Sequence, residues 1–405
     1  MRKIKSEPAH FAYIDALRGY AFLLVLLAHS ASSVGEFNGN LFITYAGVCG
    51  VQLFFIISAF TLCNSLNARQ ESDRYPVLSF YIRRLFRIAP LFWIAMAFYW
   101  LVPGVAPAYW LQACAPPGGV SWEDFVLTGL FVNGWHPYTL SSIVPGGWSI
   151  AVEMNFYIIF PLLFCYLATT GRVVTAFLVT SCAIVFEPLL FFYLGIYRDT
   201  APVAYYFFIS HGLIAELPVF LLGIVLYQIL LRRPSFHKNL LWSFCLLLVS
   251  VLAFCLLIPL NIELDATRFP FHILLSMALA GGVFALSGGR LTWLTNPVIC
   301  YIGKISYSCY LVHFAALTLT LKIFGETLSP ENRRLDFHDQ WDNGVLFVLV
   351  LLIALIVTIG LSTLTLHWIE NPGIDLGKKL IRYANRNFSP KRSEPILATL
   401  PGAEN

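Results

Sequence analysis

The sequence predicts an all-α protein that crosses a membrane about ten times. Of its 405 residues, 58% are hydrophobic and 12% are charged, and the mean hydropathy is +0.73. This composition excludes a soluble protein and a disordered chain, and it is typical of a multi-pass helical membrane protein. The predicted membrane-spanning segments are residues 13–32, 42–66, 86–103, 148–168, 173–193, 213–231, 240–260, 270–287, 296–322 and 344–368.

The lysine and arginine residues predict the orientation of these segments. Nineteen of the 26 lie on the side of the membrane that holds the N-terminus, four lie on the other side, and three lie within or at the ends of spans. Because cytoplasmic loops carry the excess of positive residues, both termini are expected in the cytoplasm. The net charge of +4 follows from this topology, so it does not indicate a nucleic-acid partner.

We expect an integral membrane domain over residues 1–376 and a basic, disordered cytoplasmic tail over residues 377–405. Charged residues interrupt the first apolar run, which argues against a cleaved signal peptide. The loop over residues 104–147 contains no lysine or arginine, and its stretch 122–132 fits an amphipathic helix at the membrane interface. The spacing of cysteine and histidine offers no zinc site, and no bound metal is expected.

The most informative feature is an arginine and a histidine in the first span. Arg18 and His29 are eleven residues apart, so they share a helix face at an axial separation of roughly 16 Å. Ionisable residues in a span usually face a polar interior. Arginine suits phosphate and histidine carries a proton near neutral pH, so the pair indicates an anion at one end of a site and proton chemistry at the other. The alternative is an arginine that snorkels to the headgroups and a histidine that caps the helix end.

Three arginines lie at the start of the third span. Arg83 and Arg87 are one helical turn apart, as are Arg84 and Arg87, so the three guanidinium groups can converge. A clamp for a polyanion and simple anchoring to anionic lipid explain this cluster equally well.

A glutamate lies near the start of the fourth span. Glu153 is expected about a turn and a half below the outer face, at the depth predicted for His29. A buried glutamate needs a partner, and a carboxylate with an imidazole in one apolar layer forms an acid–base pair. A static salt bridge between two helices is the structural alternative.

Three polar residues share one face of the ninth span. Ser306, Tyr310 and His313 follow i, i+4, i+7 spacing. His313 falls in the outer half of the membrane and Ser306 lies deeper. For His313, a hydrogen-bonded packing role is the alternative to a role in a reaction. In the second span, Gly50 and Gln52 are expected to serve helix packing.

Taken in order, these stretches resemble the membrane-bound acyltransferase-3 family, whose members transfer acyl groups to extracytoplasmic carbohydrates and related acceptors. The resemblance extends over residues 15–372. One departure is Gln52, which stands where many members have an aspartate, so any role of that carboxylate is neutral or absent here. The residues that carry the resemblance are Arg18 and His29; Arg83, Arg84 and Arg87; Trp148, Ser149 and Glu153; Ser306, Tyr307, Tyr310 and His313; and Glu370, Asn371 and Pro372.

The resemblance implies an integral membrane O-acyltransferase that uses cytosolic acyl-CoA, above all acetyl-CoA, to modify a carbohydrate hydroxyl at the outer face. Acyl-CoA is then a co-substrate, and no permanently bound cofactor is expected. His29, oriented by Glu153, is expected to deprotonate the acceptor hydroxyl. His313 or Tyr310 is expected to stabilise the oxyanion, and a covalent acyl-histidine intermediate stays open. The expected donor-binding residues are Arg18, Arg83, Arg84, Arg87 and Ser306.

The second interpretation is a transporter or flippase for a glycan, a lipid or a small anion, with the buried histidine, glutamate and arginine residues as coupling groups. Transporters commonly contain repeated halves, and the first and last five spans show no such correspondence. The enzyme is therefore favoured. Its expected location is the bacterial inner (plasma) membrane, with the lipid bilayer, the acyl donor and a carbohydrate acceptor as partners.

Overall fold

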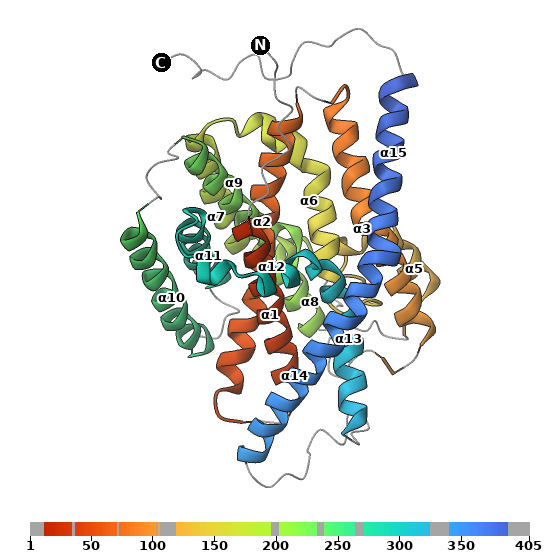
Figure 1. Ribbon diagram of the computed structural model, residues 1–405, viewed down its shortest axis with the longest axis vertical. Helices are drawn as coiled ribbons and strands as arrows, with labels where there is room; N and C mark the ends of the chain where they lie inside the picture. The colour runs from red at the N-terminus through yellow and green to blue at the C-terminus, as the bar shows by residue number, and fades with distance from the viewer. Residues whose placement is uncertain are drawn as a thin grey trace.

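The computed structural model describes residues 12–34, 37–70, 73–102, 104–105, 119–195, 202–232, 239–263, 271–324 and 340–387. In this part of the chain every regular element is a helix (Figure 1), which confirms the all-α prediction. The elements are α1 (Ala12–Ser33), α2 (Asn40–Arg69), α3 (Pro76–Leu101), α5 (Trp122–Gly129), η1 (Asn133–Trp135), α6 (Gly147–Tyr166), α7 (Thr170–Leu194), α8 (Pro202–His211), α9 (Leu213–Arg232), α10 (Leu240–Glu263), α11 (Phe271–Ser287), η2 (Thr292–Thr295), α12 (Pro297–Lys304), α13 (Ser306–Ile323), α14 (Gln340–Thr365), the π-helical turn η4 (Leu366–Glu370) and α15 (Asn371–Asn387).

The helices confirm a multi-pass membrane protein. Within the described residues, eight helices are long and apolar enough to cross a membrane, or nine if the bent pair α12–α13 is one span. The predicted span over residues 270–287 corresponds to α11, whose 17 residues stand at the lower limit of about 17 for a membrane-spanning helix, and the predicted number of ten spans stays a prediction. The cytoplasmic location of both termini stays a prediction.

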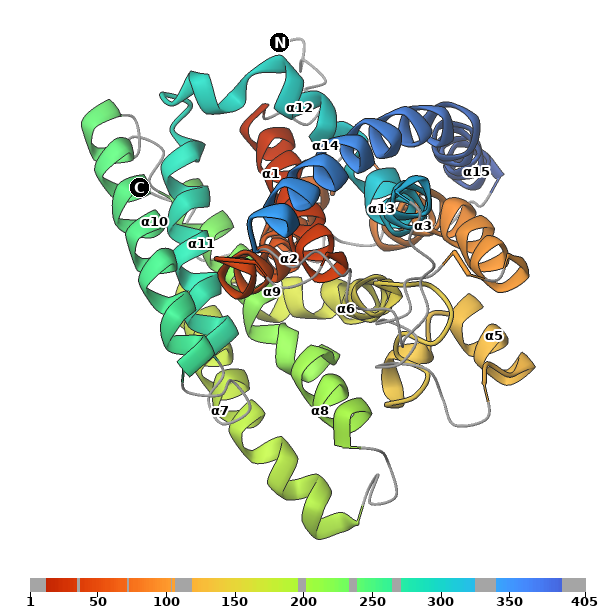
Figure 2. The same ribbon diagram turned by 90° about the horizontal axis from the view of Figure 1, so that it is seen from below.

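The centre of the molecule is built from α1, α2 and α9. Glycines allow their backbones to approach closely. A Cβ atom on Gly50 of α2 would lie 2.3 Å from the carbonyl oxygen of Ala21, and one on Gly223 of α9 would lie 2.2 Å from the carbonyl oxygen of Ile56. These contacts confirm the packing role expected for the segment around Gly50. In contrast, α7 and α10 lie at the periphery (Figure 2), where most of their side chains are exposed, as in helices that face lipid.

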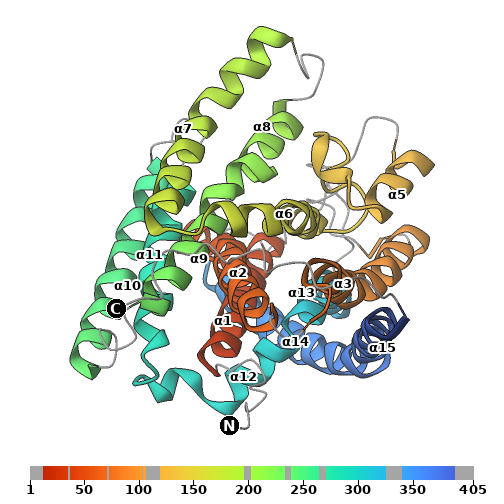
Figure 3. The ribbon, with the colours of Figure 1, turned by 90° about the horizontal axis from the view of Figure 1, so that it is seen from above.

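The predicted span over residues 296–322 is not one continuous helix. α12 and α13 meet at Ile305 with an angle of 80°. The Asn296 side chain caps α12 by accepting from the backbone N–H groups of Val298 and Ile299, and a Cβ atom on Gly303 would collide with the Asp15 carbonyl of α1. α12 is therefore held against α1 (Figure 3), and α13 begins inside the protein, where its first residue, Ser306, is buried.

A buried loop leads into α6. Residues 139–152 are almost all buried, although helix begins only at Gly147. Irregular backbone at membrane depth is tolerated where protein surrounds it and satisfies its polar groups. Here the Asn133 side chain donates to the Leu140 carbonyl at 3.0 Å, and the Thr139 hydroxyl donates to the Asn133 carbonyl at 2.9 Å. α6 therefore begins in the interior rather than at the outer surface, which changes the depth expected for its residues.

Two segments outside the spans were also predicted. The helix expected within residues 122–132 is confirmed by α5, where Ser121 and Asp124 form a reciprocal capping box. The disordered tail expected from residue 377 is partly wrong, because α15 continues to Asn387. Gly373 and Gly377 allow α15 to pack on Phe86 of α3, and this contact supports the helix. Residues 388–405 of the predicted tail lie outside the described residues.

Candidate active site

A pocket of about 730 Å³, its open mouth included, lies between α1, α2, α3, α6 and α13. The pocket brings together residues that lie up to about 290 positions apart in the sequence, from Arg18 to Tyr310. The predicted site residues that line it are Arg18, Arg84, Arg87, Glu153, Ser306 and Tyr310.

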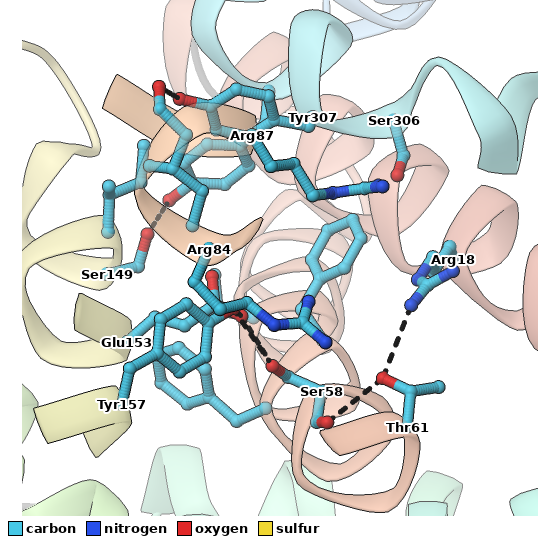
Figure 4. A pocket seen from close by; sticks show the side chains of 16 residues that line it. Arg18, Ser58, Thr61, Arg84, Arg87, Ser149, Glu153, Tyr157, Ser306 and Tyr307 are labelled. Carbon is cyan, nitrogen blue, oxygen red and sulfur yellow. Dashed lines mark hydrogen bonds between the residues drawn. The ribbon is translucent and has the colours of Figure 1, made fainter. Parts of the chain in front are cut away.

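One end of the pocket is strongly basic. Arg87 extends toward Ser306, the Arg18 guanidinium is directed toward Thr61, and Arg84 enters beside Glu153 (Figure 4). Arg18 donates to the Thr61 hydroxyl at 3.4 Å and lies 3.6 Å from the Asp15 carboxylate. The Arg84 guanidinium stands over the Tyr157 ring at 5.5 Å from its centroid. The guanidinium groups of Arg18, Arg84 and Arg87 therefore line one pocket. The sequence predicted that all three arginines of α3 converge, and the structure brings two of them to the pocket.

Arg83 does not belong to this group. Its guanidinium forms a salt bridge with Asp73, which precedes α3, and its side chain does not line the pocket. Consecutive helical residues are about 100° apart around the axis, so Arg83 lies about 40° beyond Arg87, at the edge of the face that Arg84, Arg87 and Ile88 turn toward the pocket. Its side chain pairs with Asp73 instead.

The predicted pairing of Glu153 with His29 is wrong. The Glu153 carboxylate accepts hydrogen bonds from the hydroxyl groups of Ser58 and Tyr157, each at 2.5 Å, and it interacts electrostatically with Arg84. Because α6 begins inside the protein, its seventh residue lies at the arginine end of the pocket. The spacing of Glu153 and Tyr157, one turn apart, was the signal in the sequence that would have suggested this contact.

The opposite end of the pocket is closed by hydroxyl groups. Ser149 Oγ lies 2.8 Å from the Tyr310 hydroxyl, and Tyr310 donates to the Gly146 carbonyl at 3.1 Å. Gly146 ends the buried loop with a φ of 74°, a conformation that favours glycine. A buried loop, α6 and α13 therefore meet at this point. The sequence indicated Tyr310 as a site residue but not its contact with Ser149.

Two histidines meet just beyond this closure. The rings of His29 and His313 have centroids 5.3 Å apart, and Phe314 packs against both of them. His313 is fully buried. Its Nδ1 lies 2.7 Å from the Tyr310 carbonyl oxygen. Because a carbonyl can only accept, Nδ1 carries the hydrogen and Nε2 is left with a lone pair. Nε2 has no hydrogen-bond partner in the described part of the protein.

Gln52 has a carboxylate partner on another helix. Its amide donates to Glu216 Oε1 of α9 at 3.3 Å, and both side chains are buried. The two residues do not line the pocket. The sequence alone offered no signal for this pair, because residues 164 positions apart in two apolar spans have no common pattern.

The fold and the pocket together describe a helical membrane protein in which a cluster of arginines lies near a pair of histidines, one of them, His313, fully buried. Comparison with protein families makes the assignment specific. The sequence model of the acyltransferase-3 family, described as an acyltransferase domain, matches residues 11–367. The chain belongs to this family and is an acyltransferase, so the interpretation as a transporter is set aside.

Individual relatives agree with this assignment. Acyltransferase MdmB of Streptomyces mycarofaciens is 26% identical over 376 residues, which cover 89% of this chain and 90% of that protein. The protein named "Putative O-acetyltransferase SAR0937" of Staphylococcus aureus (strain MRSA252) is 26% identical over 413 residues, which cover 96% of this chain and 61% of that protein. A similarly named protein of strain COL, SACOL0978, is matched over 58% of its length. The chain thus spans about six tenths of the staphylococcal relatives. No solved structure matches it significantly.

Proposed function

We propose that this acyltransferase moves an acyl group, most readily acetyl, from cytosolic acyl-CoA to a hydroxyl group of a carbohydrate on the opposite side of the membrane. The observation that carries the proposal is the pocket itself, which has three arginines at one end and a histidine pair just beyond the other. The relatives named as O-acetyltransferases favour an acetyl group as the cargo.

Arg18, Arg84 and Arg87 are the proposed binding site for the donor's phosphate groups. The planar guanidinium group makes bidentate, charge-assisted hydrogen bonds to phosphate oxygens. The N-terminal end of α13 adds to this site at Ser306, because the first backbone N–H groups of a helix favour an anion. Arg83 is left out of the donor site, since Asp73 already binds it.

The separation of Arg18 and His29 along α1 matches the length of donor arm needed to bring the thioester close to the histidines. Arg18 and His29 are separated by roughly 16 Å along the helix. An extended donor arm of that length places its phosphates at the arginines and its thioester near the closure formed by Ser149 and Tyr310, one turn from His313. The pocket lining runs in this direction, from Arg18 to Tyr310.

His29 is the proposed general base. It accepts the proton of the acceptor hydroxyl while the hydroxyl oxygen attacks the thioester carbonyl carbon; the C–S bond then breaks, and the departing CoA thiolate takes up the proton. His313 replaces Glu153 as the orienting partner, because its Nε2 lone pair can accept the N–H of His29. The same tautomer leaves neutral His313 without an Nε2 hydrogen, so Tyr310 is the better candidate to stabilise the oxyanion.

The remaining parts of the proposal concern location. The excess of positive residues on the N-terminal side supports cytoplasmic termini and a donor that enters from the cytoplasm. The relatives are bacterial proteins, which supports the bacterial inner membrane as the location and a cell-surface or secreted carbohydrate as the acceptor.

The donor site is tested by measuring CoA binding to the purified full-length chain in lipid nanodiscs. Arg87→Gln is expected to weaken binding by about 10- to 100-fold, because it removes charge-assisted bonds to phosphate. Arg83→Gln is the matched control: it removes a neighbouring arginine of the same helix that does not line the pocket, and binding is expected to stay within about twofold. If Arg18→Gln, Arg84→Gln and Arg87→Gln all bind CoA like the parent, the donor assignment is wrong.

A further inference from the structure

A buried carboxylate lies directly behind the basic end of the pocket. Glu370 is the last residue of the π-helical turn η4 and is 2% exposed. It does not line the pocket. Its carboxylate accepts a hydrogen bond from the Ser308 hydroxyl and another from the Ser308 backbone N–H. Glu370 therefore caps the first turn of α13, although the two residues belong to different helices.

The chain geometry explains how Glu370 reaches this position. The π-helical turn is wider than an α-helical turn, and such turns occur frequently at functional sites. The 80° break at Ile305 leaves α13 to begin inside the protein, where its first backbone N–H groups need acceptors. On one side these groups face the pocket at Ser306 and Tyr307, and on the other side Ser308 meets Glu370.

Glu370 also acts on the charge of the site. It interacts electrostatically with Arg87, which lines the pocket. Each pocket arginine thus has its own carboxylate: Asp15 for Arg18, Glu153 for Arg84 and Glu370 for Arg87. A carboxylate that caps a helix N-terminus and offsets an arginine reduces the attraction of both for a phosphate.

We propose that Glu370 is a built-in counter-anion that lowers the affinity of the donor site for CoA, so that the product CoA dissociates after acyl transfer. This inference rests on the proposed function. The acyl donor and the product CoA carry the same phosphates, so a site that binds phosphate tightly binds both equally, and tight uniform binding does not raise turnover. A fixed negative charge behind the site lowers the affinity for the acyl donor and for the product CoA. Because Glu370 does not line the pocket, it does not occupy the space in which they bind.

The test is Glu370→Gln in the full-length chain in nanodiscs. Glutamine keeps the size of the side chain and an oxygen acceptor for Ser308, but it removes the negative charge. The dissociation constant of CoA is expected to fall about tenfold, because a like charge near the phosphates is lost. With saturating acetyl-CoA, CoA should also become a stronger product inhibitor. Damage to the fold would weaken binding, so a gain of affinity separates this role from a structural one.

Two control variants isolate the charge. Asp375→Asn removes an exposed carboxylate that pairs with Lys378 on α15, and it is expected to leave CoA affinity within about twofold. Ser308→Ala removes the hydrogen bond to Glu370 but keeps the charge, so it should not tighten binding. If Glu370→Gln does not fold, the charge-balanced double variant Arg87→Gln/Glu370→Gln is compared with Arg87→Gln, and the double variant is expected to bind CoA more tightly.

The outcomes separate this inference from the donor site. If Arg87→Gln weakens CoA binding but Glu370→Gln leaves it unchanged or weaker in folded protein, the donor site stands and Glu370 is a structural cap alone. If Arg18→Gln, Arg84→Gln and Arg87→Gln all bind CoA like the parent, the proposed donor site fails and the counter-anion fails with it. Tighter binding by Glu370→Gln, together with weaker binding by Arg87→Gln, supports both.

Discussion

The rings of His29 and His313 stand 5.3 Å apart, on two helices whose residues are 284 positions apart in the sequence. Neither ring lines the pocket that holds the arginines. His313 is fixed by its hydrogen bond to the Tyr310 carbonyl, and Tyr310 closes the end of the pocket. The histidine pair is therefore one helical turn from the point where a donor that fills the pocket would end.

The first prediction concerns this pair. His29→Ala and His313→Gln are each expected to lower acyl transfer by about 100-fold or more, since a general base contributes 10²–10⁴-fold, while CoA binding is kept. The double variant should be little worse than His29→Ala, because the two residues act as one unit. Acyl groups on extracted surface glycan are followed, with the membrane protein level as a check.

Glu153→Gln provides the comparison for that experiment. Glu153 is bonded to Ser58 and Tyr157 rather than to His29, so its loss should leave the pH dependence of turnover unchanged. It should also retain at least about tenfold more activity than His29→Ala. Complete loss of transfer in Glu153→Gln, with normal CoA binding, would contradict the histidine pair as the acid–base unit.

The second prediction concerns the closure at the end of the pocket. Tyr310→Phe removes a buried hydroxyl group that contacts both the Gly146 carbonyl and Ser149 of α6. The loss is expected to lower the free energy of unfolding by about 1 kcal/mol and to reduce turnover. Tyr99→Phe is the matched control: Tyr99 also donates a buried hydroxyl to α13, at the Leu311 carbonyl, but it does not line the pocket. Both variants should lose similar thermal stability, whereas only Tyr310→Phe should lose activity. Equal turnover in the two variants would exclude a role for the Tyr310 hydroxyl.

The third prediction concerns the buried pair of Gln52 and Glu216. Gln52→Leu removes the hydrogen-bond donor of Glu216 Oε1 and leaves a buried carboxylate without it, at an expected cost of about 1–3 kcal/mol. The double variant Gln52→Leu/Glu216→Leu should recover much of this loss, because two apolar side chains replace both members of the pair. Thermal denaturation in detergent measures both variants, and a double variant no more stable than the single one would show that the pair has another role.

The sequence by itself determined the helical membrane fold, the approximate positions of most of its spans and six of the sixteen residues that line the pocket. These follow from local properties: an apolar run of about 20 residues crosses a bilayer, and an arginine or histidine within such a run must find a polar interior. For that reason Arg18, Arg87 and Tyr310 were predictable as site residues, and the structure places all three on one pocket.

Only the tertiary structure decided which of these residues meet. The predicted depth of Glu153 assumed that its helix begins at the membrane surface, but a buried loop moves the start of α6 inward, so Glu153 meets Ser58 and Tyr157. The break at Ile305 likewise turns one predicted span into two helices, and the cap that Glu370 provides for α13 could not be expected without it. The physical reason is that hydropathy measures the free energy of placing each segment in lipid or water. Which side chains contact one another depends instead on how the faces of helices distant in sequence pack together.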